Sequence, residues 1–135
     1  MARILVVDDD PVVAALLFET LTTAGHQVIL ANDVALGFAL TQSQSLDLAI
    51  VDIEMPGEQV EKPDALPAGF ELLQRIKEHN ASIAVIIITG AASQEWVVAT
   101  LRGGGQDFLQ KPFISDDVLK RVVAALEQQK IAWAY

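Results

Sequence analysis

The chain has 135 residues, 52% of them hydrophobic and none of them cysteine, and its formal net charge is −9 at pH 7. This length and composition suit one folded domain spanning residues 1–135, exclude disulfides and thiolate metal sites, and disfavour direct binding to nucleic acid or an anionic membrane. No apolar run approaches the ~20 residues of a membrane-spanning helix and no secretory signal opens the chain, so we expect a cytoplasmic protein that does not enter a membrane.

Short apolar runs alternate with helical patterns along the whole chain. We predict, in order, a strand at 3–7, a helix at 11–24, a strand at 27–31, a helix at 33–43, a strand at 47–51, a helix at 69–79, a strand at 83–88, a helix at 93–102, a strand at 107–109 and a helix at 115–133. Asp10 suits the N-cap of the first helix, Asn32 or Asp33 that of the second, and Ser115 that of the last. Gly25 suits the residue that follows the first helix.

Five strand–helix repeats predict an α/β fold. Right-handed crossovers make it a doubly wound five-stranded parallel sheet of order 2-1-3-4-5, in a flavodoxin-like three-layer sandwich. Residues 58–67 break the rhythm with two prolines and no apolar period, so we expect an extended loop at about 57–68. The last helix ends in an aromatic-rich stretch up to Tyr135, and we expect it to lead into a linker.

Polar side chains end four of the apolar runs. Asp8 and Asp9 follow the first strand, Asp52 follows the third, Thr89 the fourth and Lys111 the fifth. In the predicted strand order these groups share one edge of the sheet, with the first two aspartates beside Asp52. Open α/β sheets hold their ligands at this edge.

The chemistry of such a cluster favours a cation and a phosphoryl group. Carboxylates packed together repel by ~4 kcal/mol per pair at 4 Å for an effective dielectric constant of 20, so a proton or a cation must offset their charge. Oxygen ligands without Cys or His indicate Mg²⁺. A carboxylate can attack phosphorus, while Lys111 and Thr89 supply a positive charge and a hydroxyl to the phosphoryl oxygens. Each residue alone fits a helix cap or a turn, but their shared face favours one site.

Four segments carry a resemblance to a known family. Residues 4–11 (ILVVDDDP), 51–57 (VDIEMPG), 86–90 (IIITG) and 108–113 (FLQKPF) make the chain similar to the receiver domain of two-component response regulators, of the chemotaxis-regulator type. The resemblance implies that Asp52 is the phosphoacceptor. It also implies that Asp9, Asp52 and the backbone carbonyl of Glu54 bind Mg²⁺ directly, and that Asp8 binds it through water.

The resemblance also implies how a signal is received and passed on. Thr89 and Lys111 would contact the phosphoryl group, and Thr89 and Phe108 would switch conformation with it. The donor would be a histidine kinase or a histidine phosphotransfer protein. The output would be the face formed by the fourth helix, fifth strand and fifth helix, with a homodimer through that face and an effector domain beyond Tyr135 as further expectations. Such a domain assists its own phosphorylation and dephosphorylation but is not a turnover enzyme.

Two departures from the family's usual pattern border the site. The spacing between Gly57 and Gly69 is longer than usual, and Glu54 places a negative charge two residues beyond Asp52. We hypothesise that this charge changes the lifetime of the acyl phosphate.

Two other functions remain open from the residues. Asp8-x-Asp10 loosely matches the first motif of haloacid dehalogenase-type phosphohydrolases, which would make Asp8 the nucleophile and Asp10 the general acid. A scaffold that works without phosphorylation is the other alternative. His26 and His79 are isolated, which favours surface or packing roles.

Overall fold

The computed structural model describes residues 1–54, 67–90 and 93–134, with the side chains of residues 131–134 outside the description. Its elements are β1 (Arg3–Val7), α1 (Pro11–Thr23), β2 (Gln27–Ala31), α2 (Val34–Ser43), β3 (Leu48–Asp52), α3 (Ala68–His79), β4 (Ala84–Thr89), α4 (Gln94–Arg102), β5 (Asp107–Gln110) and α5 (Ser115–Ala134). Most of the predicted loop at about 57–68 lies outside the described residues. Only its last part is seen, where Pro67 precedes α3 and Ala68 begins it.

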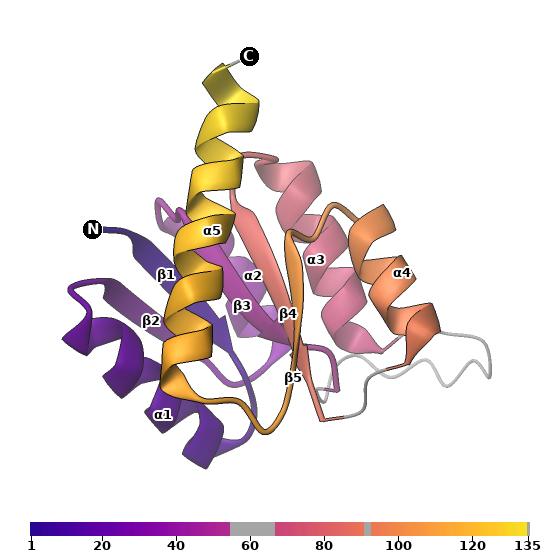
Figure 1. The fold of residues 1–135 in the computed structure, drawn as a ribbon. Helices are drawn as coiled ribbons and strands as arrows, with labels where there is room; N and C mark the ends of the chain where they lie inside the picture. The colour runs from indigo at the N-terminus through magenta and orange to yellow at the C-terminus, as the bar shows by residue number, and fades with distance from the viewer. Residues whose placement is uncertain (55–66, 91–92, 135) are drawn as a thin grey trace.

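The strands form one parallel sheet, in which β1 lies between β2 and β3, as predicted (Figure 1). The order is β2-β1-β3-β4-β5, which confirms the predicted doubly wound topology. All strands run in one direction, so their carboxyl ends lie at the same edge of the sheet. The order reverses between β1 and β3, which places the ends of these two strands side by side.

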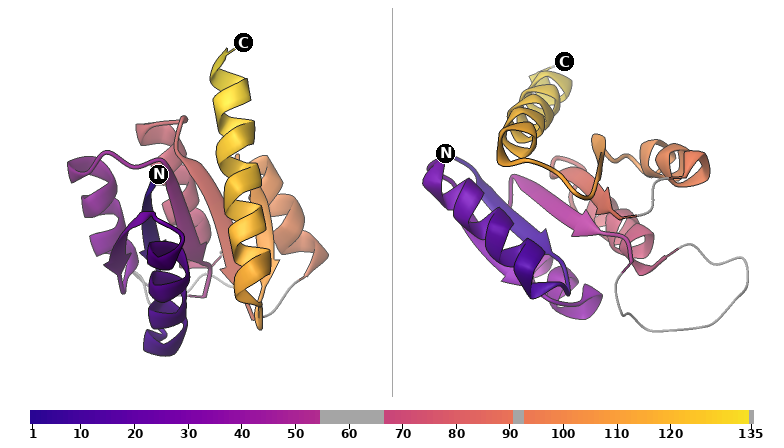
Figure 2. Two further views of the ribbon diagram at one scale, coloured as in Figure 1. Left: turned by 60° about the vertical axis from the view of Figure 1, so that its left-hand side comes forward. Right: turned by 60° about the horizontal axis from the view of Figure 1, so that its bottom comes forward.

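Helices cover both faces of the sheet, which makes three layers (Figures 1 and 2). Side chains alternate along each strand, so Ile4 and Val6 face α1 and α5, whereas Leu5 and Val7 face α2 and α3. The central strands are apolar on both faces because both faces are covered. Every residue of β3 and β4 is buried. The strands are therefore packed between two hydrophobic cores.

The helix starts follow the predicted caps at α1 and α2. The Asp10 carboxylate accepts hydrogen bonds from the backbone N–H groups of Val12 and Val13, and Asp33 accepts one from Leu36. Gly25 follows α1 with φ of +96°, a conformation that glycine adopts without strain.

The predicted cap at Ser115 is wrong by one residue. Helix α5 begins at Ser115 itself, and the carbonyl of Ile114 accepts the first helical hydrogen bonds. The hydroxyl of Ser115 instead lies 3.1 Å from that of Thr20 on α1. The Ser115 side chain therefore contacts α1 instead of capping its own helix.

Within residues 1–54, 67–90 and 93–134, none of the helices combines the length and the apolar composition that a membrane-spanning segment needs.

Candidate functional site

The carboxyl edge of the sheet brings together the five polar groups singled out in the sequence. Asp8 and Asp9 follow β1, and Lys111 follows β5. Asp52 and Thr89 are the last residues of β3 and β4, one position further into the strands than the apolar runs predicted. The difference arises because ladder pairing depends on the backbone rather than on side-chain polarity. Asp52 is paired with Ile88 in the parallel ladder.

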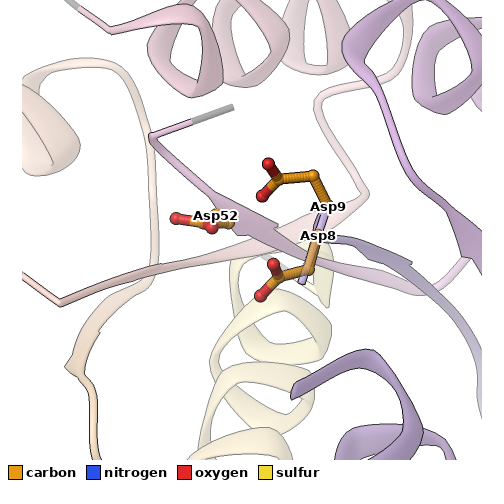
Figure 3. Close-up of side chains that lie close together, drawn as sticks. All are labelled: Asp8, Asp9 and Asp52. Carbon is orange, nitrogen blue, oxygen red and sulfur yellow. The ribbon is translucent and has the colours of Figure 1, made fainter. Parts of the chain in front are cut away.

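Three carboxylates meet at this edge. Asp8, Asp9 and Asp52 each offer one oxygen, and these oxygens all lie within 4.8 Å of one another. Figure 3 shows the carboxylates of Asp8 and Asp9 extending from adjacent positions of the chain toward that of Asp52. Asp8 and Asp52 are 2% and 4% exposed, whereas Asp9 is open to solvent. The cluster therefore has a buried floor and one solvent-facing member.

Lys111 places a cation against the buried part of the cluster. Its Nζ lies 3.0 Å from Oδ2 of Asp8 and 3.2 Å from Oδ2 of Asp52. Burial alone would lower the pKa of Lys111, but the hydrogen bond with Asp8 and the charges of Asp52 and Asp8 outweigh it and raise the pKa. Lys111 is therefore a fixed positive charge at neutral pH, shared by two carboxylates.

Backbone donors hold the two buried carboxylates in position. The N–H of Asp10 donates to Oδ1 of Asp8 over 2.9 Å, and the N–H of Glu54 donates to Oδ1 of Asp52 over 3.2 Å. Burial is the largest influence on Asp8 and raises its pKa, and the charge of Asp52 acts in the same direction, against the hydrogen bonds from Asp10 and Lys111. Burial and the charge of Asp52 therefore both disfavour the ionised form of Asp8, and a further cation beside it would offset this cost.

The donor set fits a hard divalent cation. Oδ2 of Asp8 is fully buried, and the ammonium of Lys111 lies 3.0 Å from it as an ion pair. A carboxylate oxygen has more than one lone pair, so it can also accept from water bound to a cation. All three converging groups are carboxylates, which Mg²⁺ prefers over nitrogen or sulfur ligands.

Thr89 and Glu54 make a contact between the ends of β4 and β3. The Thr89 side chain is fully buried, and its hydroxyl donates to Oε1 of Glu54 over 2.9 Å. The sequence placed both residues near Asp52 but did not indicate this hydrogen bond. The signal available was only that Glu54 lies two residues beyond the end of β3, where a long side chain can reach the neighbouring strand.

The predicted switch residue Phe108 lies on β5, opposite Ile87 in the ladder. It is half-buried and packs against the core on the side of α3 and α4. On the surface formed by α4, β5 and α5, helix α4 carries the exposed apolar side chains Val98 and Leu101. Arg121 of α5 pairs across this surface with Asp107 of β5 at 2.8 Å. The surface thus contains both apolar and charged groups.

Helix α3 comes very close to the backbone that carries Asp52. The N–H of Gly69 donates to the carbonyl of Ile53 over 3.1 Å. A Cβ atom at position 69 would lie 2.4 Å from Cα of Ile53 and 2.6 Å from the carbonyl oxygen of Asp52, which is closer than atoms can pack. A glycine is therefore required here, and its contact fixes the position of β3 relative to α3.

The position of Asp10 does not fit the phosphohydrolase alternative, in which Asp10 would be the general acid beside the nucleophile Asp8. Instead, the Asp10 carboxylate caps α1, where it accepts two backbone hydrogen bonds, and it does not belong to the group of converging carboxylates. The general-acid role of Asp10 is therefore not supported.

Comparisons with known proteins agree with this site. The family model for the response regulator receiver domain matches residues 4–123. The chain is 36% identical over 132 residues to the C4-dicarboxylate transport transcriptional regulatory protein DctD of Pseudomonas aeruginosa, which covers 96% of this chain and 26% of DctD. It is 34% identical over 128 residues to the protein PilH of the same species, which covers 93% of this chain and 98% of PilH.

Solved structures give the same result. A CheY-like response regulator receiver domain from Methanospirillum hungatei superposes with a TM-score of 0.86 at 29% identity, with 98% of each chain covered. The chain spans about a quarter to a half of the first curated relatives, 26% of DctD and 51% of the transcriptional regulatory protein YrkP of Bacillus subtilis. The fold, the family match and the acidic edge of the sheet agree, and the chain belongs to the response regulator receiver domain family of two-component systems.

Proposed function

We propose that this chain is a phosphorylation-dependent signalling receiver that takes a phosphoryl group onto Asp52 from a histidine kinase or a histidine phosphotransfer protein. One observation carries the proposal: the Asp52 carboxylate lies 3.2 Å from the Nζ of Lys111 and belongs to the same cluster as the carboxylates of Asp8 and Asp9. A nucleophilic carboxylate beside a fixed cation and an acidic cation-binding cluster is the arrangement that phosphoryl transfer to a side chain requires.

The transfer itself is a simple exchange of bonds at phosphorus. An oxygen of Asp52 forms a new bond to phosphorus, while the bond from phosphorus to the donor's imidazole nitrogen breaks and leaves its electron pair on that nitrogen. Lys111 lies where it balances negative charge on the phosphoryl oxygens, and the Thr89 hydroxyl can donate a hydrogen bond to one of them. Hydrolysis of the acyl phosphate by water returns Asp52 to a free carboxylate. These self-directed steps make the chain a signalling domain rather than a turnover enzyme.

Asp9, Asp52 and the backbone carbonyl of Glu54 would hold Mg²⁺ directly, and Asp8 would hold it through water. The convergence of one oxygen from each of Asp8, Asp9 and Asp52 within 4.8 Å supports this set. When bound, the cation supplies positive charge that offsets the carboxylates and the phosphoryl oxygens. The protein's part is to keep the acidic groups fixed and Asp52 oriented by the N–H of Glu54.

The output side of the proposal rests on Thr89 and Phe108. Thr89 moves toward the phosphoryl group, and Phe108 turns into the space released, so the surface of α4, β5 and α5 changes shape. Exposed Val98 and Leu101 of α4 give that surface apolar groups for a second copy or an effector domain. We further propose that the domain works in the cytoplasm, where histidine kinases display their phosphorylated histidines.

Labelling with radioactive acetyl phosphate in the presence of MgCl₂ separates the three candidate functions. The proposal predicts a label that is lost in Asp52→Asn and retained, at a lower rate, in Asp8→Asn. A phosphohydrolase with Asp8 as nucleophile predicts the reverse pattern. A phosphorylation-independent scaffold predicts that the wild type takes no label from acetyl phosphate or from a phosphorylated histidine phosphotransfer protein.

A further inference from the structure

The Thr89 hydroxyl, which the proposed function assigns to the phosphoryl group, already donates a hydrogen bond to the Glu54 carboxylate. We propose that Glu54 is a positioning residue that holds the Thr89 hydroxyl in the unphosphorylated chain, and that the phosphoryl group must displace it. The proposal rests on Asp52 being the phosphoacceptor. In this proposal the Glu54 carboxylate and the phosphoryl group compete for the same hydrogen-bond donor, the Thr89 hydroxyl.

The geometry ties Glu54 to both partners of the reaction. Its backbone N–H donates to Oδ1 of Asp52 over 3.2 Å, and its side-chain Oε1 accepts from the Thr89 hydroxyl over 2.9 Å. Ile53, which lies between Asp52 and Glu54 in the chain, is fully buried, and its N–H donates to the carbonyl of Ile88. These contacts fix the backbone that leads to Glu54. Glu54 is therefore held where its carboxylate bridges the ends of β3 and β4.

Competition follows from the chemistry of a hydroxyl. A threonine hydroxyl has one proton to donate, and here it is donated to the Glu54 carboxylate. A phosphoryl oxygen on Asp52 that uses the same proton must first displace that carboxylate. Both acceptors are anionic, so they cannot share the space beside Asp52 without strong repulsion. The unphosphorylated arrangement is stabilised by the hydrogen bond that phosphorylation breaks.

Charge works in the same direction as the hydrogen bond. Glu54 adds a negative charge to an edge that already holds Asp8, Asp9 and Asp52, and the incoming donor is an anion. Removing the side chain of Glu54 therefore removes both the competitor for Thr89 and part of the repulsion against the donor. Replacing it with glutamine removes the charge but keeps an oxygen that can accept from Thr89.

The variants Glu54→Ala and Glu54→Gln test the contributions of the hydrogen bond and of the charge. The matched control is Glu127→Ala, which removes an exposed glutamate of α5 that takes no part in the site. We expect the rate constant for labelling by acetyl phosphate with MgCl₂ to rise roughly three- to tenfold in Glu54→Ala, as suits the loss of one hydrogen bond to a carboxylate on a solvent-exposed residue. We expect a smaller rise in Glu54→Gln and no change in the control.

A second measurement needs no phosphodonor. The methyl resonance of Thr89 in the unphosphorylated chain should shift in Glu54→Ala, move less in Glu54→Gln and stay in place in Glu127→Ala. An unmoved Thr89 resonance in Glu54→Ala would overturn the proposal, as would an unchanged labelling rate while Asp52 still takes the label. Failure of the proposed function looks different: the wild type and every Glu54 variant then remain unlabelled, and both proposals fall together.

Discussion

Replacing Asp9 with asparagine should make the protein more stable in the absence of divalent cations. The carboxylate oxygens of Asp8, Asp9 and Asp52 lie within 4.8 Å of one another, so Asp9 repels two buried carboxylates. At that separation one pair of unit charges interacts by about 3.5 kcal/mol at an effective dielectric constant of 20 and by about 0.9 kcal/mol in water. Because Asp9 is exposed, the lower figure applies to each of its two pairs, and the nearby Lys111 cation offsets part of their sum, so we expect a gain of about 1 kcal/mol in the free energy of unfolding.

The same substitution should remove the effect of magnesium. At a concentration ten times its dissociation constant, a cation that binds only the folded wild type adds about 1.4 kcal/mol to the free energy of unfolding. Asp9→Asn loses one of the carboxylates of the cluster and should gain far less at the same concentration. Equilibrium urea unfolding, once with EDTA and once with MgCl₂, measures both effects on one preparation.

The control is Asp116→Asn, which changes the net charge equally at an exposed position in the first turn of α5. It should leave the magnesium response intact and lower stability by a few tenths of a kcal/mol, since a negative charge suits a helix N-terminus. The electrostatic reasoning is refuted if Asp9→Asn is no more stable than the wild type in EDTA. The metal assignment is refuted if both proteins gain equally from MgCl₂.

Two further predictions concern positions around the site and at the opposite edge of the sheet. Gly69→Ala should lower the free energy of unfolding by about 1–3 kcal/mol because its Cβ would lie 2.4 Å from Cα of Ile53. Gly90→Ala should cost little in the same urea assay, since no contact within 4 Å of its Cβ is found among the described residues. Burial and the positive N-terminus lower the pKa of His26, so the unfolded chain takes up its proton more readily than the folded chain. The free energy of unfolding should then be highest above about pH 7 and decline as the pH falls through 6.5. This decline should be less steep in His26→Gln, whereas His79→Gln should decline as the wild type does. Identical pH profiles for the wild type and His26→Gln would contradict this.

Much of the site could be predicted because parallel strands align their ends. Once Asp8, Asp52 and Thr89 were each recognised at the end of an apolar run, the strand order was enough to bring them to one edge. The one-residue shift at β3 and β4 shows the limit of this reasoning, since apolar runs mark burial whereas strands end where backbone pairing ends. Asp10 followed local rules fully because an N-cap depends only on its own helix.

The contacts that were missed depend on side-chain reach and on tertiary packing. No local pattern indicates that the Glu54 carboxylate meets Thr89, since the residues are far apart in the chain and a glutamate has several rotamers. Ser115 was assigned to a helix cap, but a hydroxyl on α1 became its partner. The closeness of Gly69 to Ile53 likewise follows from how α3 packs on β3, which the sequence does not specify.

The most direct test of the account is to locate the phosphoryl group. The chain is incubated with acetyl phosphate and MgCl₂, the acyl phosphate is reduced with borohydride, and the modified residue is identified by peptide mass spectrometry. We predict a single modified residue, Asp52, whose carboxylate lies 3.2 Å from the Nζ of Lys111 and converges with those of Asp8 and Asp9. Modification at another aspartate, or none in a folded protein that binds magnesium, would contradict it.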